Sequence, residues 1–370
     1  MSENLLLDGF SPAGEGTQFF VTWGMESGES PGTGTVLFKR DTNIYISKEP
    51  WQTQGQFDTV ALNVKDFSFN RQSVKEVIGR QTLDPTELRG VAPQISALSP
   101  VSFSFVTYID PLVDTNVTSP EEYLWVSLMG VDSLTSNPTS STIDFANGNV
   151  RELQELTLWF DRPDQSRGNM RIDNCVVDRA TINFNKNELC EITWEGRGLT
   201  LIEDNTPPVL FVDRTGASPC LKNKLTTILF DMDDITYNLA LIGGSIIINN
   251  NNTFYGRSKL GEVSTPTGHY TGKRSITGNL NFYLKTGTNA SFDLYNEILI
   301  QAGSSTFEVL QVANITLNIG GVTAPNMQIN IPQAIFNIGR QDFSEVVAVE
   351  MPFTAKEETN NYTSVIYQMP

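Results

Sequence analysis

Few residues of this chain have the type and spacing that catalysis requires. The single histidine, His269, lies in a polar stretch of Gly, Thr and Lys residues, with no Gly-x-Ser-x-Gly or His-Glu-x-x-His pattern elsewhere. No glycine-rich phosphate loop of the P-loop or dinucleotide-binding type follows an expected strand. We therefore predict that His269 is a surface loop residue, and we expect neither catalytic residues nor a cofactor.

The densest group of carboxylates is the run Asp231-Met232-Asp233-Asp234. In a strand, Asp231 and Asp233 would share one face and could bind a divalent cation through oxygen ligands. The glycine and the distal glutamate of a calcium-binding loop are missing. The preferred interpretation is a solvated acidic turn with no metal.

A glycosidase needs two carboxylates that converge in one cleft, and the sequence alone does not reveal such a separation. Glu188, Glu191 and Glu195 alternate with apolar residues, as in an ordinary half-buried strand. Tryptophans could form a platform for a sugar, although single tryptophans along strands more often belong to a core. The candidates are Trp51, Trp125, Trp159 and Trp194.

The composition is that of a folded protein large enough for two domains. The chain has 370 residues, of which 39% are hydrophobic and 10% aromatic. No apolar run approaches the roughly 20 residues of a membrane span, and the first residues lack the pattern of a secretion signal. Cys175, Cys190 and Cys220 have no Cys-x-x-Cys spacing, so we expect reduced thiols in a cytosol and no zinc site.

The chain has a net negative charge, and its acidic residues are unevenly distributed. The formal net charge is −17, with 29 acids and 15 bases in residues 1–205 against 13 and 10 in residues 206–370. Residues 101–150 hold six acids and no Lys or Arg. The excess of negative charge argues against a surface that binds phosphates. Two interpretations remain, a solvated acidic face or a surface that must not retain a polyanion.

Apolar residues alternate with Ser, Thr and Asn along most of the chain, which indicates strands with one buried face. The clearest expected strands are residues 67–69, 101–108, 153–160, 180–184, 189–194, 315–319, 327–331 and 346–351. Two helices are expected, one that Ser119 and Pro120 would start and that stops at Gly130, and one from Ser291 to Gly303. The sequence thus predicts an α+β fold that is mostly β.

One β-rich unit recurs. Gly79 and Arg80 precede a polar loop and the strand with Phe103 and Phe105, and 177 residues later the same order returns with Phe282 in the place of Phe105. Farther along, an offset of 157 pairs Asn169 with Asn326 and Trp194 with Met351. The conserved order predicts a duplication, with domains at residues 1–205 and 206–370 joined at Thr206-Pro207-Pro208.

The run from residue 175 to residue 198 resembles a closing hairpin of tailed-bacteriophage tail tube proteins (major tail proteins), and residues 122–130 resemble the short helix that precedes it. Residues 343–351 are similar to the closing strand of a second copy. The resemblance covers most of residues 60–200 and 240–355. It implies two tandem tail-tube-type domains, each an antiparallel β-sandwich or barrel with one short flanking helix.

The resemblance further implies a structural virion protein of a viral tail. Homotrimeric, pseudo-hexameric rings would self-assemble into a stacked tube whose β-barrel lumen holds the tape measure protein and conducts DNA at ejection without binding it specifically. Other implied partners are the tail terminator and the baseplate or distal tail proteins, with no membrane. Assembly is expected in the host bacterial cytoplasm.

The same resemblance suggests which residues serve the tube. Ser102, Ser104, Asn279 and Asn281 would face the lumen, opposite buried Phe and Leu neighbours. The loops at residues 81–100 and 258–277 would join successive rings. Their charged residues are Arg80, Asp84, Glu87, Arg89, Arg257, Lys259, Glu262, Lys273 and Arg274.

Three alternatives remain at this stage. The chain could be another tube-like component, such as a baseplate or tail-completion ring or a secretion-system tube, although a tube subunit of that last kind has one domain. It could be a β-sandwich carbohydrate-binding or adhesion protein, which predicts exposed aromatic residues. It could be a glycosidase, which predicts a deep cleft with two carboxylates.

Overall fold

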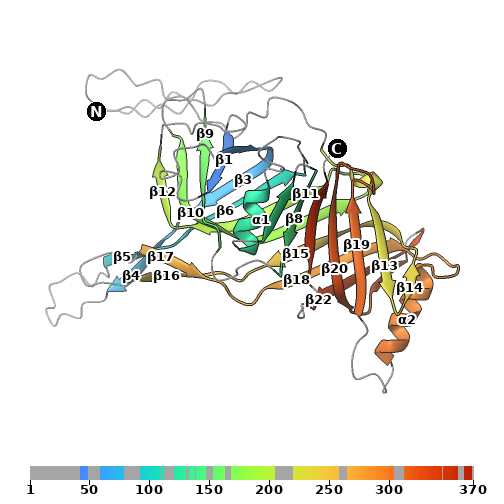
Figure 1. The fold of residues 1–370 in the computed structure, drawn as a ribbon. Helices are drawn as coiled ribbons and strands as arrows, with labels where there is room; N and C mark the ends of the chain where they lie inside the picture. The colour runs from blue at the N-terminus through green and yellow to red at the C-terminus, as the bar shows by residue number, and fades with distance from the viewer. Residues whose placement is uncertain are drawn as a thin grey trace, which may run out of the picture. The chain divides into compact units, whose positions relative to one another are not determined.

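A computed structural model describes residues 42–48, 59–78, 92–109, 111, 121–130, 133–137, 139–146, 153–162, 168–204, 220–257, 265–303, 312–343, 345–356 and 362–368. These residues form antiparallel sheets with two α-helices (Figure 1). The predicted α+β fold, mostly β, is therefore confirmed. The predicted linker and the boundary at residue 205 lie outside the described residues, so the division into two domains stays a prediction.

The largest feature is one long antiparallel sheet that contains strands from both halves of the chain. We call it the long sheet. Its strand order is β3 (Val64–Asn70), β6 (Val101–Tyr108), β11 (Glu191–Gly198), β10 (Met170–Asn185), β15 (Ala240–Asn249), β18 (Ser275–Tyr283), β22 (Val347–Ala355) and β21 (Arg340–Phe343).

Two smaller sheets carry the remaining paired strands. The first has the order β2 (Val60–Leu62), β1 (Asn43–Lys48), β9 (Leu156–Asp161), the first part of β10, and β12 (Thr200–Glu203). The second has the order β14 (Ile235–Tyr237), β13 (Thr227–Met232), β19 (Val312–Ile319), β20 (Asn326–Phe336), β23 (Ser364–Gln368), β8 (Ser140–Asp144) and β7 (Leu134–Asn137).

The two halves share one pairing pattern. In each, a central hairpin pairs on one side with an earlier strand, which in turn pairs with a short strand, and on the other side with a later strand. The two orders are β2-β1-β9-β10-β12 and β14-β13-β19-β20-β23. The hairpin β7–β8 from the first half extends the second of these sheets at β23. This shared pattern supports the proposed duplication.

Two further hairpins lie side by side and extend away from the sheets (Figure 1). They are β4 (Ser73–Ile78) with β5 (Ala92–Leu98), and β16 (Thr253–Arg257) with β17 (Thr265–Tyr270). A short 3-10 turn, η2 (Asn223–Leu225), precedes β13. Both hairpins occur at the same point of their half, between the first two strands that each half gives to the long sheet.

The helices differ in how deeply they are buried. Every residue of α1 (Glu122–Met129) is buried, whereas α2 (Ser291–Gly303) leaves Phe292 and Ile300 exposed. The N-cap of α1 is Glu121, without a side-chain capping bond, so the helix begins later than the expected start at Ser119 and Pro120. The expected bounds of α2 are confirmed.

Contacts within the first half and with the second half hold α1 in place. Trp125 packs edge-on against Trp194, with ring centroids 5.0 Å apart, and its Nε1 donates a hydrogen bond of 2.8 Å to the hydroxyl of Tyr367 on β23. Asn250 donates to the carbonyl of Leu128, and Arg274 donates to the carbonyl of Met129 at 3.2 Å. Residues of the second half thus satisfy carbonyls at the carboxyl end of a helix in the first.

We expect Tyr367→Phe to lower the free energy of unfolding by about 1–3 kcal/mol, because the buried indole N–H of Trp125 loses its acceptor. Tyr270→Phe is the matched control, since the Tyr270 side chain is 57% exposed. Urea unfolding monitored by tryptophan fluorescence measures both variants. Equal midpoints for the two variants would contradict this account of the α1 contact.

Candidate assembly surface: the seam and the free edges of the long sheet

The two halves meet in the long sheet through direct backbone pairing. Residues 179–185 of β10 pair with residues 249–243 of β15, so that Ile182 lies opposite Ile246 and Phe184 opposite Gly244. We call this pairing the seam. A Cβ on Gly244 would lie 2.8 Å from the ring of Phe184, so the glycine makes room for that ring.

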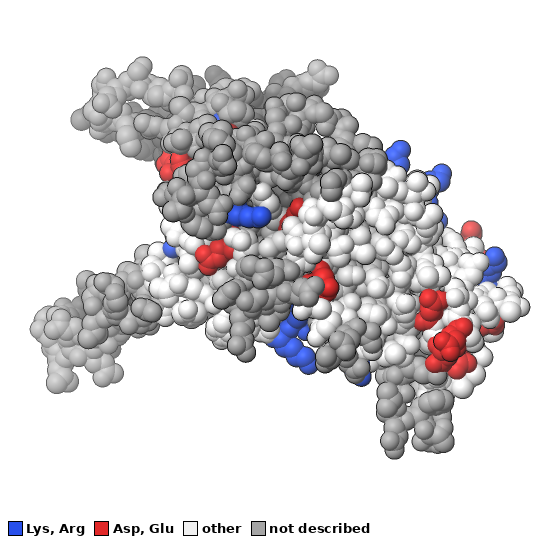
Figure 2. Space-filling view, in the orientation of Figure 1, with Lys and Arg blue, Asp and Glu red and all other residues white. Residues whose placement is uncertain are grey.

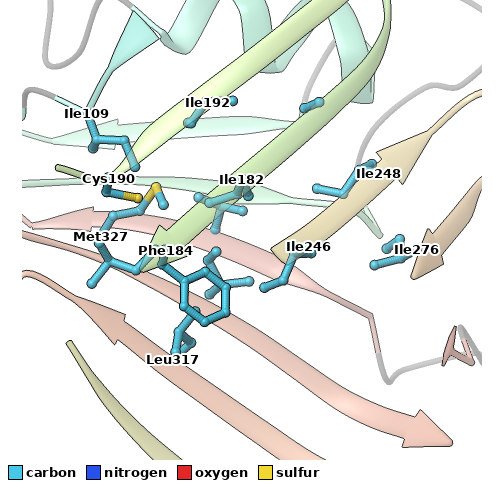
Figure 3. Close-up of a cluster of buried hydrophobic side chains, with 14 of the residues drawn as sticks. Ile109, Ile182, Phe184, Cys190, Ile192, Ile246, Ile248, Ile276, Leu317 and Met327 are labelled. Atoms are coloured by element: carbon cyan, nitrogen blue, oxygen red, sulfur yellow. The ribbon is translucent and has the colours of Figure 1, made fainter. Parts of the chain in front are cut away.

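The apolar residues on the core side of the seam are fully buried. Figure 3 shows side chains from both halves converging on one cluster beneath it. The cluster includes Ile109, Ile182, Phe184, Cys190, Ile192, Ile246, Ile248, Ile276, Leu317 and Met327. Burial raises the pKa of the Cys190 thiol far above its ordinary value, so the group stays protonated at neutral pH. The seam is therefore a packed hydrophobic junction.

The long sheet has a buried face and a polar face. Phe103, Phe105, Leu280 and Phe282 are at most 3% exposed and point into the core, while their neighbours in sequence point the other way. Those neighbours are the four predicted lumen residues. Ser102 is exposed, and Ser104, Asn279 and Asn281 are half-buried. Asn279 accepts a hydrogen bond from Ser245 and donates one to Glu350.

Strand registers allow the halves to be compared position by position. Phe105 lies opposite Trp194, and Leu280 lies opposite Met351. If Trp194 corresponds to Met351, then Phe105 corresponds to Leu280, at an offset of 175. The sequence offset of 177, which pairs Phe105 with Phe282, is therefore two residues too long at this strand. Phe67 of β3 lies opposite Phe105, and Gly244 of β15 lies opposite Leu280. Phe67 therefore corresponds to Gly244, and strands β3 and β15 correspond at the offset of 177.

A shared packing device supports the corrected alignment. On the first half Phe103 lies opposite Gly196, and on the second Gly278 lies opposite Phe353. A Cβ on Gly196 would lie 2.3 Å from the Phe103 ring, and one on Gly278 would lie 2.6 Å from the Phe353 ring. Each half thus covers one glycine with one aromatic ring, with the roles exchanged between the two strands.

The long sheet ends in two strands that have only one partner each. Among the described residues, β3 pairs only with β6, and β21 pairs only with β22. Phe343 on β21 is 75% exposed, and nearby Val346 is 52% exposed. At the other end, Phe67 and Phe69 of β3 pack against Phe160, with ring centroids 5.4 and 4.7 Å away. Strand edges that have no partner among the described residues and that carry apolar side chains favour pairing with another chain.

The remaining predicted residues fall in several places. Arg80, Asp84, Glu87, Arg89, Lys259 and Glu262 lie outside the described residues, as does the side chain of Arg257. Lys273 is exposed beside β18. Arg274 contacts the end of α1 and packs over Phe145, with its guanidinium carbon 5.6 Å from the ring centroid. A role of these residues between rings stays a prediction.

The prediction for His269 is wrong. It lies in strand β17, its side chain is only 12% exposed, and its ring packs against Phe254 at 5.6 Å. Burial lowers its pKa, with an opposing effect from Glu155, whose Oε1 is 3.8 Å from Nδ1. Sequence reasoning missed the strand because Gly, Thr and Pro surround it, residues that favour turns.

The other chemical candidates do not form a site. Asp233 and Asp234 have positive φ in the turn between β13 and β14, so a strand face shared with Asp231 is wrong and the solvated turn is confirmed. Trp125, Trp159 and Trp194 are at most 3% exposed, so they offer no sugar platform, and Trp51 lies outside the described residues.

Among the described residues, no group of three or more His, Cys, Asp or Glu side chains could hold a metal ion. None of the described helices is long and apolar enough to span a membrane. Cys175, Cys190 and Cys220 form no disulfide.

A sheet with an internal seam, a polar face and two edges that lack a partner among the described residues is typical of a structural subunit that assembles by joining sheets. No protein-family profile matches the chain. Among curated proteins, the chain is similar to the tail tube protein pb6 of Escherichia phage T5, with 26% identity in an alignment of 340 residues that covers 85% of this chain and 72% of that protein. The chain is thus a homologue of a phage tail tube protein, and the resemblance seen in the sequence is confirmed.

We expect Gly278→Ala to destabilise the protein by about 1–3 kcal/mol, because the new methyl group would lie 2.4 Å from the carbonyl oxygen of Ser245 and 2.6 Å from the Phe353 ring. Gly303→Ala is the control, since no atom lies within 4 Å of its added Cβ and alanine favours a helix. Thermal and urea unfolding compare the two. A stable Gly278→Ala protein would show that the ring does not need the glycine.

Proposed function

We propose that this chain is the major structural subunit of a phage tail tube and that three copies close into a pseudo-hexameric ring. Each chain would supply two tube-type domains, residues 1–205 and 206–370, joined by the seam. The observation that carries the proposal is the seam itself: β10 of the first half pairs with β15 of the second, while the equivalent edges at the ends of the sheet have no partner among the described residues.

The seam provides a template for the contact between chains. Arg340 of β21 lies opposite Glu350 of β22, and Thr181 of β10 lies opposite Thr193 of β11. Because Thr193 corresponds to Glu350 at the offset of 157, Thr181 corresponds to Arg340. Strand β21 therefore corresponds to the seam portion of β10 at an offset of 159. Strand β3 corresponds to β15 at an offset of 177. Pairing β21 with β3 of the next chain would therefore repeat the seam.

If the contact between chains repeats the seam, the exposed Phe343 acquires a partner on the next chain. Phe184, at the seam, is 1% exposed, and its equivalent Phe343 is 75% exposed. In the repeated seam Phe343 would lie opposite Phe67 of the next chain, because Phe184 lies opposite Gly244. A cross-strand pair of aromatic rings would then replace the aromatic–glycine pair. Burial of one phenylalanine contributes about 1.5–3 kcal/mol to each contact.

Contacts of this kind are heterologous, and they form a closed ring when the rotation between neighbours closes. Closure removes both free edges, which would otherwise pair without limit. The polar face with Ser102, Ser104, Asn279 and Asn281 would then line a channel. That channel would hold the tape measure protein before ejection and conduct viral DNA at ejection.

Ring stacking is the second part of the proposal. The hairpins β4–β5 and β16–β17 extend together away from the sheets (Figure 1). Strands β5 and β17 lie within the two segments predicted to reach the next ring, residues 81–100 and 258–277, so these segments are partly strand and not loops throughout. The tail terminator and the baseplate or distal tail proteins would bind the ends of the tube. The subunit would assemble in the host bacterial cytoplasm and reside in the virion tail.

We expect Phe343→Glu to abolish ring formation while leaving the fold intact, because this side chain is 75% exposed in the isolated chain. Negative-stain electron microscopy and mass photometry over a concentration series measure assembly. The unmodified chain should give trimeric rings or tubes with a central hole, and the variant should remain a monomer with an unchanged melting temperature.

Val322→Glu is the control for an added charge at an exposed apolar position, since Val322 is 73% exposed but lies outside the long sheet. It should still form rings. Trimers from Phe343→Glu would refute the assigned edge, and a strictly monomeric unmodified chain would refute the ring.

A further inference from the structure

The second half of the chain has an apolar groove outside the long sheet. Its volume is about 500 Å³, within the range of roughly 300–1,000 Å³ that is usual for ligand pockets. One wall of the groove is the η2 turn, which contributes Leu225, and the other is the turn between β19 and β20, which contributes Val322. Of the described residues that line the groove, only Lys222 is charged.

Two glycines bring the walls of the groove together. Gly320 and Gly321 have φ angles of 86° and 108°, which glycine adopts without strain. A Cβ on Gly320 would lie 3.0 Å from Cδ2 of Leu221, and one on Gly321 would lie 3.6 Å from Cβ of Leu225. The β19–β20 turn therefore lies directly against η2, and the groove is a built feature of the second half.

The groove exposes apolar side chains on both walls. Val322 is 73% exposed and Leu225 is 61% exposed. With Phe343, they are the three most exposed large hydrophobic side chains among the described residues. Figure 2 shows that uncharged residues cover much of the described surface, so one exposed apolar residue does not mark a site. Two such residues that line one groove do indicate an occupant.

The segment that joins the two halves contains an apolar run. Residues 205–219 lie outside the described residues, and they end next to Cys220, which lines the groove. Within this segment, Val209-Leu210-Phe211-Val212 is the longest apolar run. Seven residues separate it from Cys220, among them the turn-forming Gly216, and seven extended residues span up to about 25 Å. The chain is thus long enough to turn back and place the run in the groove.

Covalent attachment favours this occupant over a segment of another chain. A short tether gives its end an effective concentration in the roughly millimolar range, which a separate chain reaches only in a dense assembly. Charge adds to the fit, because Asp213 directly follows the apolar run and Lys222 lines the groove. An apolar run with an acid at one end matches an apolar groove with one base.

We propose that Val209–Val212 docks into this groove of its own chain, with Phe211 between Leu225 and Val322. The docked run covers the groove, so that a single chain does not present it to other chains before assembly. It also fixes the path of the chain from β12 in the first half to β13 in the second. The inference does not depend on the proposed ring.

The reactivity of Cys220 tests the proposal. Cys220 lines the groove and is half-buried, whereas Cys175 and Cys190 are fully buried. The rate at which a small aromatic disulfide reagent modifies Cys220 in the native chain, with mass spectrometry to identify the cysteine, measures access to the groove. The test variant is Phe211→Ser. Phe292→Ser is the matched control, since Phe292 is 46% exposed on α2.

We expect Phe211→Ser to raise the rate of Cys220 modification at least about tenfold, because burial of one phenylalanine shifts a docking equilibrium by that factor or more. Phe292→Ser should react like the unmodified chain. Leu225→Ser should also raise the rate, and its combination with Phe211→Ser should add little, as expected for two residues in contact. Hydrogen exchange at the β19–β20 turn should become faster in the Phe211→Ser chain, and the melting temperature checks that each variant is folded.

The measurement is made at a concentration at which mass photometry shows single chains. Equal rates for the unmodified chain and Phe211→Ser, with equal hydrogen exchange at the β19–β20 turn, would overturn the proposal. Protection of Cys220 that appears only at concentrations where chains associate would overturn it as well, because the occupant would then be a second copy.

Discussion

The backbone pairing of β10 with β15 is the constraint on which the rest of the structure depends. A strand edge exposes unpaired N–H and C=O groups, and the chain satisfies one such edge with its own second half. This pairing brings the apolar faces of both halves over one core, including Ile182, Phe184 and Ile246. It also orders the polar residues of both halves along one face.

The same junction explains why the halves differ in exposure. Helix α1 is buried throughout and has its carboxyl end satisfied by Asn250 and Arg274 of the second half, whereas α2 exposes Phe292 and Ile300. Strand β10 is paired along both edges at the seam, whereas β21, its proposed equivalent, is paired along one edge among the described residues. The second half thus shows exposed apolar residues where the first half has an internal partner. In the proposed ring, another chain supplies that partner.

Local features of the fold were predictable from the sequence. Alternation located strands such as β6, and the Gly130 stop located the end of α1, because periodicity and turn chemistry act over a few residues. The seam was not predictable, since nothing within 179–185 specifies a partner some 60 residues away at 243–249. The sequence offsets of 177 and 157 disagree by two residues at the strand of Phe105, because the period of a strand lets a shift of two preserve the pattern of burial.

Of the candidate site, the sequence predicted the polar neighbours of Phe103 and Leu280 but missed Phe343, the exposed equivalent of a buried residue. No local signal distinguishes an exposed phenylalanine at a sheet edge from a core phenylalanine, because that difference lies in the missing partner strand.

The most direct measurement is disulfide trapping of the repeated seam between chains. Asn183 lies opposite Ser245, so the equivalent pair between chains is Asp342 and Ser68. Cysteines at these two positions, in a Cys220→Ser background, should give covalent dimers and trimers on mild oxidation, ending at the trimer. Asn70 with Asp342, two residues out of register on the same face, should react much more slowly. Absence of cross-links from the Ser68 and Asp342 pair, or equal cross-linking by both pairs, would contradict the account.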